Sequence, residues 1–347
     1  MGISLEELQL AARNHGMPLE ALRYPVTPAG LHYLLIHYDI PAVDAETWRL
    51  DVRGRATLTL SIEELRARPA AELAATMECA GNGRALLDPR PVSQPWLAEA
   101  VGTARWRGTP LRRLLEEAGV PAGTVDVVFR GLDVGIEGNE PPQPYARALR
   151  VDDALRDEVL LAYEMNGAPL PPQHGFPLRL VVPGWYGMTN VKWLAEVELV
   201  REPFAGFQNR RAYLFRRTED DAGTPVDRMQ PRALMVPPGV PDFFTRRRFV
   251  ARGPCTLEGR AWSGLAPVTA VEVSADGGAT WGAATLGEDL GRWAWRGWSF
   301  RWDARPGEHL VCARARDAAG NEQPLEAEWN LGGYANNGVQ RIAVTVA

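Results

Sequence analysis

One short stretch, residues 74–84 (AATMECAGNGR), combines a cysteine, two glycines and an arginine in an order that suits chemistry. Cys79 follows an apolar run and precedes Ala-Gly-Asn-Gly, which predicts a strand ending in a tight turn with the sulfur at the edge of a loop. The glycines let the backbone approach a bulky ligand closely. Arg84 lies five positions further on, and its charge favours thiolate over thiol. A thiolate there is either a nucleophile or a ligand for a soft metal.

Plainer interpretations of Cys79 stay open at this point. A cysteine beside a glycine turn is often only a buried side chain, and one cysteine with one arginine does not decide its role. A cysteine hydrolase would need a His–Asp pair near the nucleophile, and no such pattern accompanies it. The cysteines at 79, 255 and 312 form no CxxC pair, so zinc is not indicated. Cys255 and Cys312 are expected to be reduced core residues rather than a disulfide.

Four further segments follow the cysteine loop in order: residues 103–106 (TARW), residues 160–175 (LLAYEMNGAPLPPQHG), residues 176–194 (FPLRLVVPGWYGMTNVKWL) and residues 329–331 (WNL). Together with the loop, they resemble the sulfite oxidase family of molybdopterin oxidoreductases. The resemblance runs from Thr27 to the C-terminus. It implies an α+β architecture: a mixed α+β molybdopterin-binding catalytic domain at residues 1–225, then an immunoglobulin-like β-sandwich at residues 226–347 that serves for dimerisation.

The resemblance also implies a cofactor site. Cys79 corresponds to the cysteine that binds molybdenum together with the dithiolene of a molybdopterin, a soft ligand set for a metal that changes oxidation state. Residues at family positions that contact the cofactor are His37, Asp133, His174, Arg179 and Lys192. The alternative is that these are ordinary strand-end charges and core histidines.

On the substrate side, the resemblance makes Arg84 an anion-binding arginine, Trp96 a pocket wall and Tyr213 the active-site tyrosine. The departures from the family pattern concern charge. Leu35 and Gly332 stand where the family has arginines, Gly83 replaces another basic residue, and Ala212 replaces an aspartate. We therefore expect a charge-poor pocket that binds sulfite weakly or prefers a less charged compound, unless other basic residues such as Arg210 or Arg211 move in.

The elements that must position these residues follow from local pattern. Residues 1–23 predict a short helix on the surface, Trp48, Leu50 and Val52 alternate as in a strand, and Ser61 with Glu64 predicts a capped helix at residues 62–66. Thr109-Pro110 opens a helix that Gly119 ends. Residues 125–130, 159–165 and 178–182 predict strands, with a turn at Asn166-Gly167. After a proline-rich linker, short strands with Gly/Asp turns predict the β-sandwich.

Composition limits the partners. The chain has 347 residues, enough for two domains, and a formal charge of −5, which argues against nucleic acid or an anionic membrane. No apolar run approaches a membrane span, and residues 1–16 show no secretory pattern, so a cytoplasmic location is expected. No glycine fingerprint for NAD or ATP is present.

We therefore predict a homodimeric molybdenum-dependent oxidoreductase without its own haem domain. It transfers an oxygen atom on a small substrate and exchanges electrons with an external carrier. The alternatives are a molybdenum-dependent reductase of a sulfoxide or nitrate and an inactive cofactor-binding protein.

Overall fold

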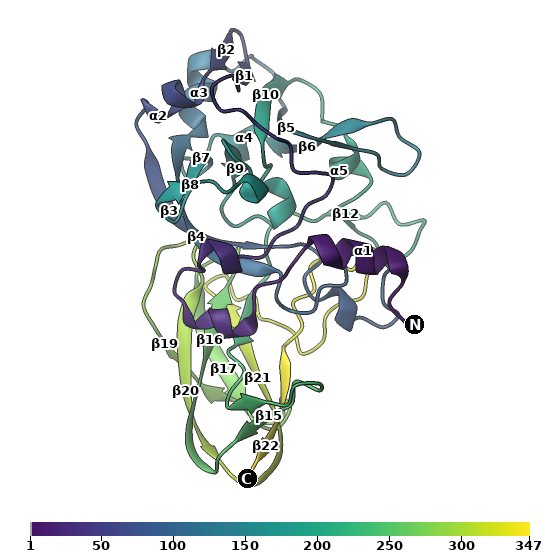
Figure 1. The fold of residues 1–347 in the computed structure, drawn as a ribbon, viewed down its shortest axis with the longest axis vertical. Helices are drawn as coiled ribbons and strands as arrows, with labels where there is room; N and C mark the ends of the chain where they lie inside the picture. Colours follow the sequence, from purple (N-terminus) through teal and green to yellow (C-terminus); the bar gives the residue numbers. More distant parts are fainter. Residues whose placement is uncertain (1) are drawn as a thin grey trace.

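The computed structural model describes residues 2–347, and strands make up most of its regular structure, with few and short helices. Figure 1 shows two parts stacked along the long axis, with the C-terminus at the far end of the second part. No helix among the described residues is long and apolar enough to cross a membrane. The structure has the predicted order of a mixed domain followed by a β-sandwich, but it contains more strand and less helix than the term α+β suggests.

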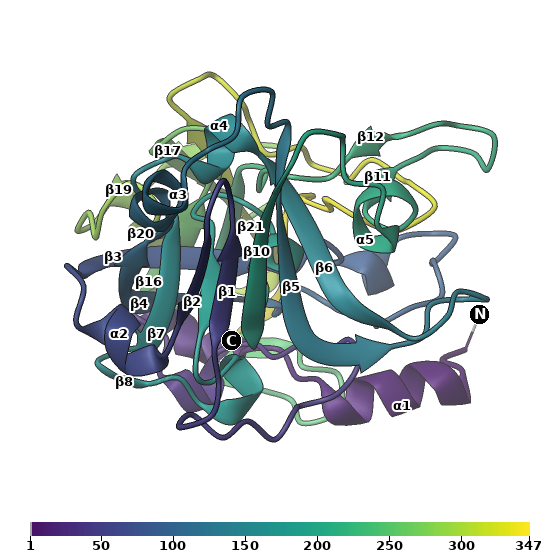
Figure 2. The same cartoon turned by 90° about the horizontal axis from the view of Figure 1, so that it is seen from above.

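The first part is built on two five-stranded sheets, of which Figure 2 shows one with its strands side by side. That sheet has the order β2-β1-β10-β5-β6 and is mixed, because β1 runs parallel to β10. Its strands are β1 (Leu50–Arg53), β2 (Thr57–Leu60), β5 (Asp126–Gly135), β6 (Gln143–Arg150) and β10 (Leu194–Val200). The second sheet has the order β3-β4-β7-β8, and β9 also pairs with β7. Its strands are β3 (Ala71–Glu78), β4 (Val101–Pro110), β7 (Leu160–Met165), β8 (Ala168–Pro169) and β9 (Arg179–Val181).

Strand β7 shows how the second sheet is covered on both faces. Leu161 and Tyr163 point into the core that joins the two sheets, whereas Leu160 and Ala162 point into a second cluster that contains Cys79. Successive strand residues face opposite sides, so a continuous apolar run is what a strand buried on both faces requires. The cysteine loop therefore grows out of a sheet that is fixed from two directions.

The helices are short, and two of them, α2 and α3, lie where the sequence predicts them. In α2 (Ile62–Arg66), Ser61 and Glu64 form the predicted capping box, and α3 (Leu111–Ala118) ends at Gly119, whose φ is 75°. The predicted turn at Asn166-Gly167 is also present, with both residues at positive φ. The remaining helices are α1 (Leu5–Arg13), α4 (Val151–Ala154) and α5 (Phe207–Arg210), with 3-10 turns η1 (Leu19–Arg23), η2 (Ala29–Leu31), η3 (Arg84–Leu86), η4 (Pro172–His174) and η5 (Gly187–Thr189).

The single surface helix predicted for residues 1–23 is wrong. The segment divides into α1 and η1, because Gly16 packs so closely on Glu99 that a Cβ there would lie 2.7 Å from the Glu99 Cβ, and Pro18 follows. Met17 and Leu22 are buried in a cluster that reaches Trp262 and Trp295 of the second part. The end of this segment therefore fills the space between the two parts instead of lying on the surface.

The second part is a β-sandwich of a four-stranded and a six-stranded sheet, ordered β13-β16-β20-β19 and β14-β15-β22-β21-β17-β18. Its core takes residues from both sheets, such as Leu257 and Trp298 from one and Val271 and Val344 from the other. The strands are β13 (Arg232–Met235), β14 (Val240–Pro241), β15 (Arg248–Val250), β16 (Gly253–Trp262), β17 (Val268–Ser274), β18 (Gly282–Ala283), β19 (Thr285–Leu286), β20 (Arg296–Ala304), β21 (Gly307–Asp317) and β22 (Arg341–Val346). A two-stranded sheet of β11 (Leu214–Phe215) and β12 (Thr224–Pro225) precedes them. The boundary between residues 225 and 226 stays a prediction.

Trp295, in the second part, forms hydrogen bonds to strand β3 and to the N-terminal segment. The Trp295 backbone N–H donates to Thr76 Oγ1 at 2.7 Å, and the Trp295 indole donates to the Pro25 carbonyl at 2.7 Å. The buried bond to Thr76 ties strand β3, which ends just before Cys79, to the C-terminal part, and the partly buried bond to Pro25 ties the N-terminal segment to it. All three cysteines are free, so Cys255 and Cys312 form no disulfide.

Candidate active site

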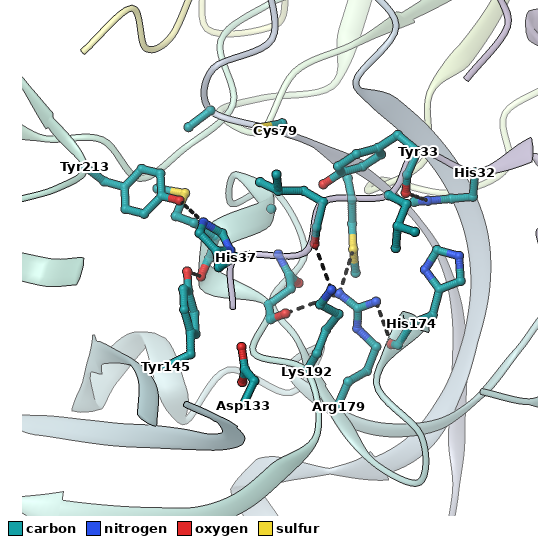
Figure 3. A pocket seen from close by; sticks show the side chains of 17 residues that line it. His32, Tyr33, His37, Cys79, Asp133, Tyr145, His174, Arg179, Lys192 and Tyr213 are labelled. Atoms are coloured by element: carbon teal, nitrogen blue, oxygen red, sulfur yellow. Dashed lines mark hydrogen bonds between the residues drawn. The ribbon is translucent and has the colours of Figure 1, made fainter. Parts of the chain in front are cut away.

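Cys79 lies directly after β3, at the start of the predicted turn. Its backbone N–H donates to the Ala100 carbonyl at 2.9 Å, its own carbonyl accepts from Asn82, and Gly83 takes φ 92°. The side chain is 7% exposed and lines a cavity (Figure 3). Burial raises the pKa of the Cys79 thiol, while the charge of Arg84 acts to lower it. The expected effect of Arg84 is present, but burial is the larger influence, so the free protein holds a thiol until a metal displaces its proton.

The cavity contains about 630 Å³ of empty space, part of it open to solvent. It receives side chains from the segment between η2 and β1, from the Cys79 loop, from β5 and β6, from the loops around β9, and from the segment after α5. The predicted residues that line it are His37, Cys79, Asp133, His174, Arg179, Lys192 and Tyr213. These residues lie far apart in the sequence and are brought to one place by the fold, while Arg84 and Trp96 lie beside Cys79 but outside this lining.

Two cations form one wall of the cavity, and backbone carbonyls hold both. Arg179 donates to the carbonyls of His174 at 3.0 Å and Asn190 at 3.2 Å, with its guanidinium 4.8 Å from the Trp106 ring. Lys192 donates to the Leu35 carbonyl at 2.8 Å. Burial lowers the pKa of Arg179 to about 10 and that of Lys192 well below its usual range. Among residues 2–347, no carboxylate lies within ion-pair distance of either, so this wall suits an anionic ligand.

Histidines complete this side of the cavity. His174 is buried, and its ring centroid lies 5.6 Å from that of His32, a residue that our sequence analysis did not select. Burial lowers the pKa of His174 to about 2 and that of His32 to about 4, with smaller contributions from the neighbouring Arg179. His37 is also held neutral, because burial lowers its pKa to about 3. All of these rings are therefore neutral donors or acceptors near pH 7.

Among the residues that the structure describes, Asp133 is the one carboxylate that lines the cavity. It is buried at the end of β5, and burial raises its pKa to about 6, with the charge of Lys192 acting in the opposite direction. Its Oδ1 atom is buried and has no hydrogen-bond partner within the described chain. Such an atom is suited to accept a hydrogen bond from a ligand N–H group.

Tyr213 lines the other side of the cavity, and Tyr334 and Trp96 lie near it outside the cavity lining. A hydrogen bond of 2.6 Å joins the Tyr213 hydroxyl to His37 Nε2, as Figure 3 shows, and the Tyr213 ring centroid lies 5.2 Å from that of Tyr334. Burial raises the pKa of both phenols. The Trp96 indole lies beside the sulfur and acts to lower the pKa of Cys79.

Arg84 is turned towards the C-terminal segment rather than into the cavity. It donates to the carbonyls of Gly332 at 2.9 Å and Gln94 at 3.2 Å, and its guanidinium lies 5.2 Å from the Tyr334 ring centroid. Gly332 has no room for a side chain, because a Cβ there would lie 2.3 Å from the Tyr334 ring. Tyr334 thus fills the space beside Gly332, the position where the family pattern has an arginine.

The alternative to a charge-poor pocket, in which Arg210 or Arg211 replaces the missing charge, is not seen in the structure. Arg211 lies at the surface and pairs with Glu140 at 2.7 Å, and Arg210 is exposed. Sequence reasoning missed His32, Tyr33, Tyr145 and Tyr334, which have no motif of their own. For the cation wall, the composition itself carries a signal. Lys192 is the only lysine among the 38 lysines and arginines of the chain, so its choice over arginine at this position stands out.

Two protein-family models match the chain. The oxidoreductase molybdopterin binding domain covers residues 37–208, and the Mo-co oxidoreductase dimerisation domain covers residues 239–347. The first includes most of the cavity lining, and the second lies within the β-sandwich and the segments that border it.

Known proteins of similar sequence and structure agree with these matches. Sulfite oxidase of Gallus gallus is 38% identical over 337 residues, which are 91% of this chain and 72% of that protein. Mitochondrial sulfite oxidase of Homo sapiens is 36% identical over 93% of this chain, which spans 62% of the human protein. The crystal structure of the sulfane dehydrogenase SoxCD from Paracoccus pantotrophus superposes with a TM-score of 0.83 at 26% identity, covering 96% of this chain and 86% of that one.

Proposed function

The chain belongs to the sulfite oxidase family of molybdenum-dependent oxidoreductases, and from this premise we propose that it oxidises sulfite or a related, less charged sulfur compound by oxygen-atom transfer. For sulfite, water provides the oxygen atom, and the products are sulfate, two protons and two electrons. The electrons pass to an external carrier. One observation carries the proposal: Cys79 shares its cavity with two cations, the buried Arg179 and the partly buried Lys192, neither of which has a carboxylate within ion-pair distance among residues 2–347.

The buried polar atoms of the cavity that lack a hydrogen-bond partner match the groups that a molybdopterin offers. His32 Nε2, Asp133 Oδ1 and Arg179 Nε are buried without a hydrogen-bond partner in the part of the chain that the structure describes. Leaving such atoms unpaired costs about 1–3 kcal/mol each, so a ligand that pairs with them binds with an advantage. A pterin offers ring donors and acceptors for His32 and Asp133, and its phosphate suits Arg179 and Lys192.

In the proposed site, each residue has a limited task. When bound, the cofactor supplies a molybdenum centre that can transfer an oxygen atom and accept two electrons. Cys79 would hold the metal, and His174, Arg179 and Lys192 would hold the pterin. His37 is neutral and fixes the orientation of the Tyr213 hydroxyl through its hydrogen bond. Tyr213 and Trp96 would border the space beside the sulfur, where the substrate enters, and Arg84, which is turned away from that space, would hold the C-terminal segment through the Gly332 carbonyl.

The assembly and the location are part of the same proposal. We propose a homodimer through residues 226–347, which is supported by the match to a dimerisation domain. Phe243 and Phe244, between β14 and β15, are 84% and 90% exposed, as expected of residues that a partner covers. We also propose a cytoplasmic location without a nucleic-acid or membrane partner, although the relatives include enzymes named mitochondrial.

The proposed reaction is tested by steady-state turnover of molybdenum-loaded protein with artificial electron carriers. We expect oxidation of sulfite or a related sulfur compound, and loss of that activity in Cys79→Ser. Reduction of nitrate or a sulfoxide, with no sulfur compound oxidised, would favour the reductase instead. Molybdenum-loaded protein that turns over none of these substrates would favour an inactive cofactor-binding protein.

A further inference from the structure

Buried arginines in this protein fall into two groups, those with and those without a carboxylate partner. Arg232 pairs with Glu78 at 2.7 Å, and Arg248 lies 3.6 Å from Glu20. Arg147, on β6, is only 4% exposed and has no carboxylate within 4 Å among residues 2–347. Within the described part of the chain, its one hydrogen bond goes from Nη1 to the Gln208 carbonyl, and its buried Nε has no partner. Arg147 therefore carries a buried charge without a direct ion pair among residues 2–347; Asp227 stabilises this charge only from beyond 4 Å, and Arg147 lies outside the cavity lining.

A buried charge without a counter-ion destabilises a protein unless a ligand compensates it. Burial lowers the pKa of Arg147, which reflects this cost, but a guanidinium stays protonated at neutral pH. The uncharged carbonyl of Gln208 offsets only part of the cost. An anion that binds nearby is the simplest source of the missing compensation.

The position of Arg147 indicates where that anion would lie. Its guanidinium carbon lies 5.5 Å from the Tyr213 ring centroid. Two residues earlier on β6, the Tyr145 ring centroid lies 4.8 Å from that of His37, with the two rings tilted by 37°. His37 is the hydrogen-bond partner of Tyr213, and Figure 3 shows Tyr145 and Tyr213 on the same side of the cavity. Residues i and i+2 of a strand share a face, so Arg147 and Tyr145 face the same side of the sheet.

Arg147 and Cys79, the proposed metal ligand, both influence the pKa values of the Tyr213 and Tyr334 phenols. The charge of Arg147 acts to lower the pKa of Tyr213 and of Tyr334, whereas Cys79 acts to raise both. The phenols therefore lie within electrostatic reach of the sulfur and of the guanidinium. This is the space beside Cys79 into which Arg84 does not point.

We infer that Arg147 is a specificity-determining residue, whose charge selects an anionic substrate at the part of the cavity wall that Tyr213 forms. The inference rests on the proposed function and assigns its substrate class, a sulfur oxyanion such as sulfite rather than a neutral compound. Arg147 thereby supplies charge that the chain lacks at Leu35 and Gly332. It differs from Arg210 and Arg211, which lie at the surface.

The test uses molybdenum-loaded wild type, Arg147→Gln and Arg147→Lys, with Arg211→Gln as the matched surface control. Sulfite KM and kcat are measured with an artificial electron acceptor, and the Kd of sulfate is measured by calorimetry on the resting enzyme. In Arg147→Gln we expect KM and the sulfate Kd to rise about tenfold to a hundredfold, with kcat changed much less. Arg147→Lys should recover part of the loss, and Arg211→Gln should match the wild type.

Molybdenum content is measured for each variant, so that a loss of cofactor is not taken for a loss of substrate binding. If Arg147→Gln cannot be loaded, Arg147→Lys against wild type decides, since lysine keeps the charge and changes its geometry. Unchanged KM and sulfate Kd in a loaded Arg147 variant would overturn the role of Arg147 and leave the proposed function standing. Sulfate binding that Arg147→Gln weakens, in an enzyme that does not oxidise sulfite, would support Arg147 and overturn sulfite as the substrate.

Discussion

The carboxylate of Glu78 and the guanidinium of Arg232 lie 2.7 Å apart, and each side chain is 3% exposed. Glu78 directly precedes Cys79, and Arg232 begins the first strand of the sandwich. Glu78 also accepts hydrogen bonds from the Trp262 indole at 2.9 Å and from Asn82 at 3.0 Å. The residue before the proposed metal ligand is therefore held by the C-terminal part, and the position of the sulfur depends on contacts between the two parts.

Breaking this pair should destabilise the protein strongly. Glu78→Gln or Arg232→Met leaves one buried charge without its partner, which costs about 3–5 kcal/mol. Denaturant unfolding followed by tryptophan fluorescence measures the loss. The matched control is the exposed pair Arg217–Glu328, with side chains 69% and 58% exposed, whose disruption should hardly move the midpoint. Equal, small shifts for both pairs would contradict the importance of the buried one.

The buried histidines make the stability of cofactor-free protein depend on pH. Burial lowers the pKa of His174 from 6.5 to about 2, so the unfolded chain binds a proton at a pH where the folded protein does not. Its contribution to stability is complete above pH 6.5 and is lost as pH falls towards the folded pKa. His174→Gln should therefore reduce the slope of unfolding free energy against pH by about 1.4 kcal/mol per pH unit below pH 6.

The control for this slope is His15→Gln, at an exposed position, which should leave it unchanged. Asp133 has the opposite effect on stability, because burial raises its pKa to about 6 in the folded protein. As pH falls, Asp133 therefore binds its proton in the folded protein before it does so in the unfolded chain. Asp133→Asn should therefore steepen the loss of stability between pH 6 and 4. If wild type, His174→Gln and Asp133→Asn show the same slope of unfolding free energy against pH, the pKa values of His174 and Asp133 are not shifted in this way.

How far the sequence alone predicts this site depends on the distance between the interacting residues. The turn after Cys79 and the capping box at Ser61 and Glu64 were predictable, because a few adjacent residues determine them. The direction in which Arg84 points was not predictable, because its hydrogen-bond partner Gly332 lies 248 positions away. The space that a side chain at position 332 would need is filled by Tyr334. Arg147 has no motif, and only its missing partner in the folded protein distinguishes it from other arginines.

The single lysine offers a chemical test of the cation wall. Because burial lowers the pKa of Lys192 well below its usual range, more of its amine is neutral and nucleophilic near pH 8 than in an ordinary lysine. An amine-specific reagent should modify Lys192 readily in cofactor-free protein, as read by peptide mass spectrometry, with the N-terminus as internal reference. Loading the cofactor should block the reaction. Equal labelling of loaded and cofactor-free protein would show that the cofactor lies elsewhere.

The central claim is that Cys79 binds molybdenum in this cavity, and X-ray absorption at the molybdenum edge tests it most directly. The samples are wild type, Cys79→Ser and the control Cys255→Ser, purified from a host that makes the cofactor. We predict about one molybdenum per chain in the wild type, loss of one sulfur neighbour in Cys79→Ser, and no change in Cys255→Ser. A well-folded wild type that contains zinc or no metal, or an unchanged sulfur shell in Cys79→Ser, would contradict the account.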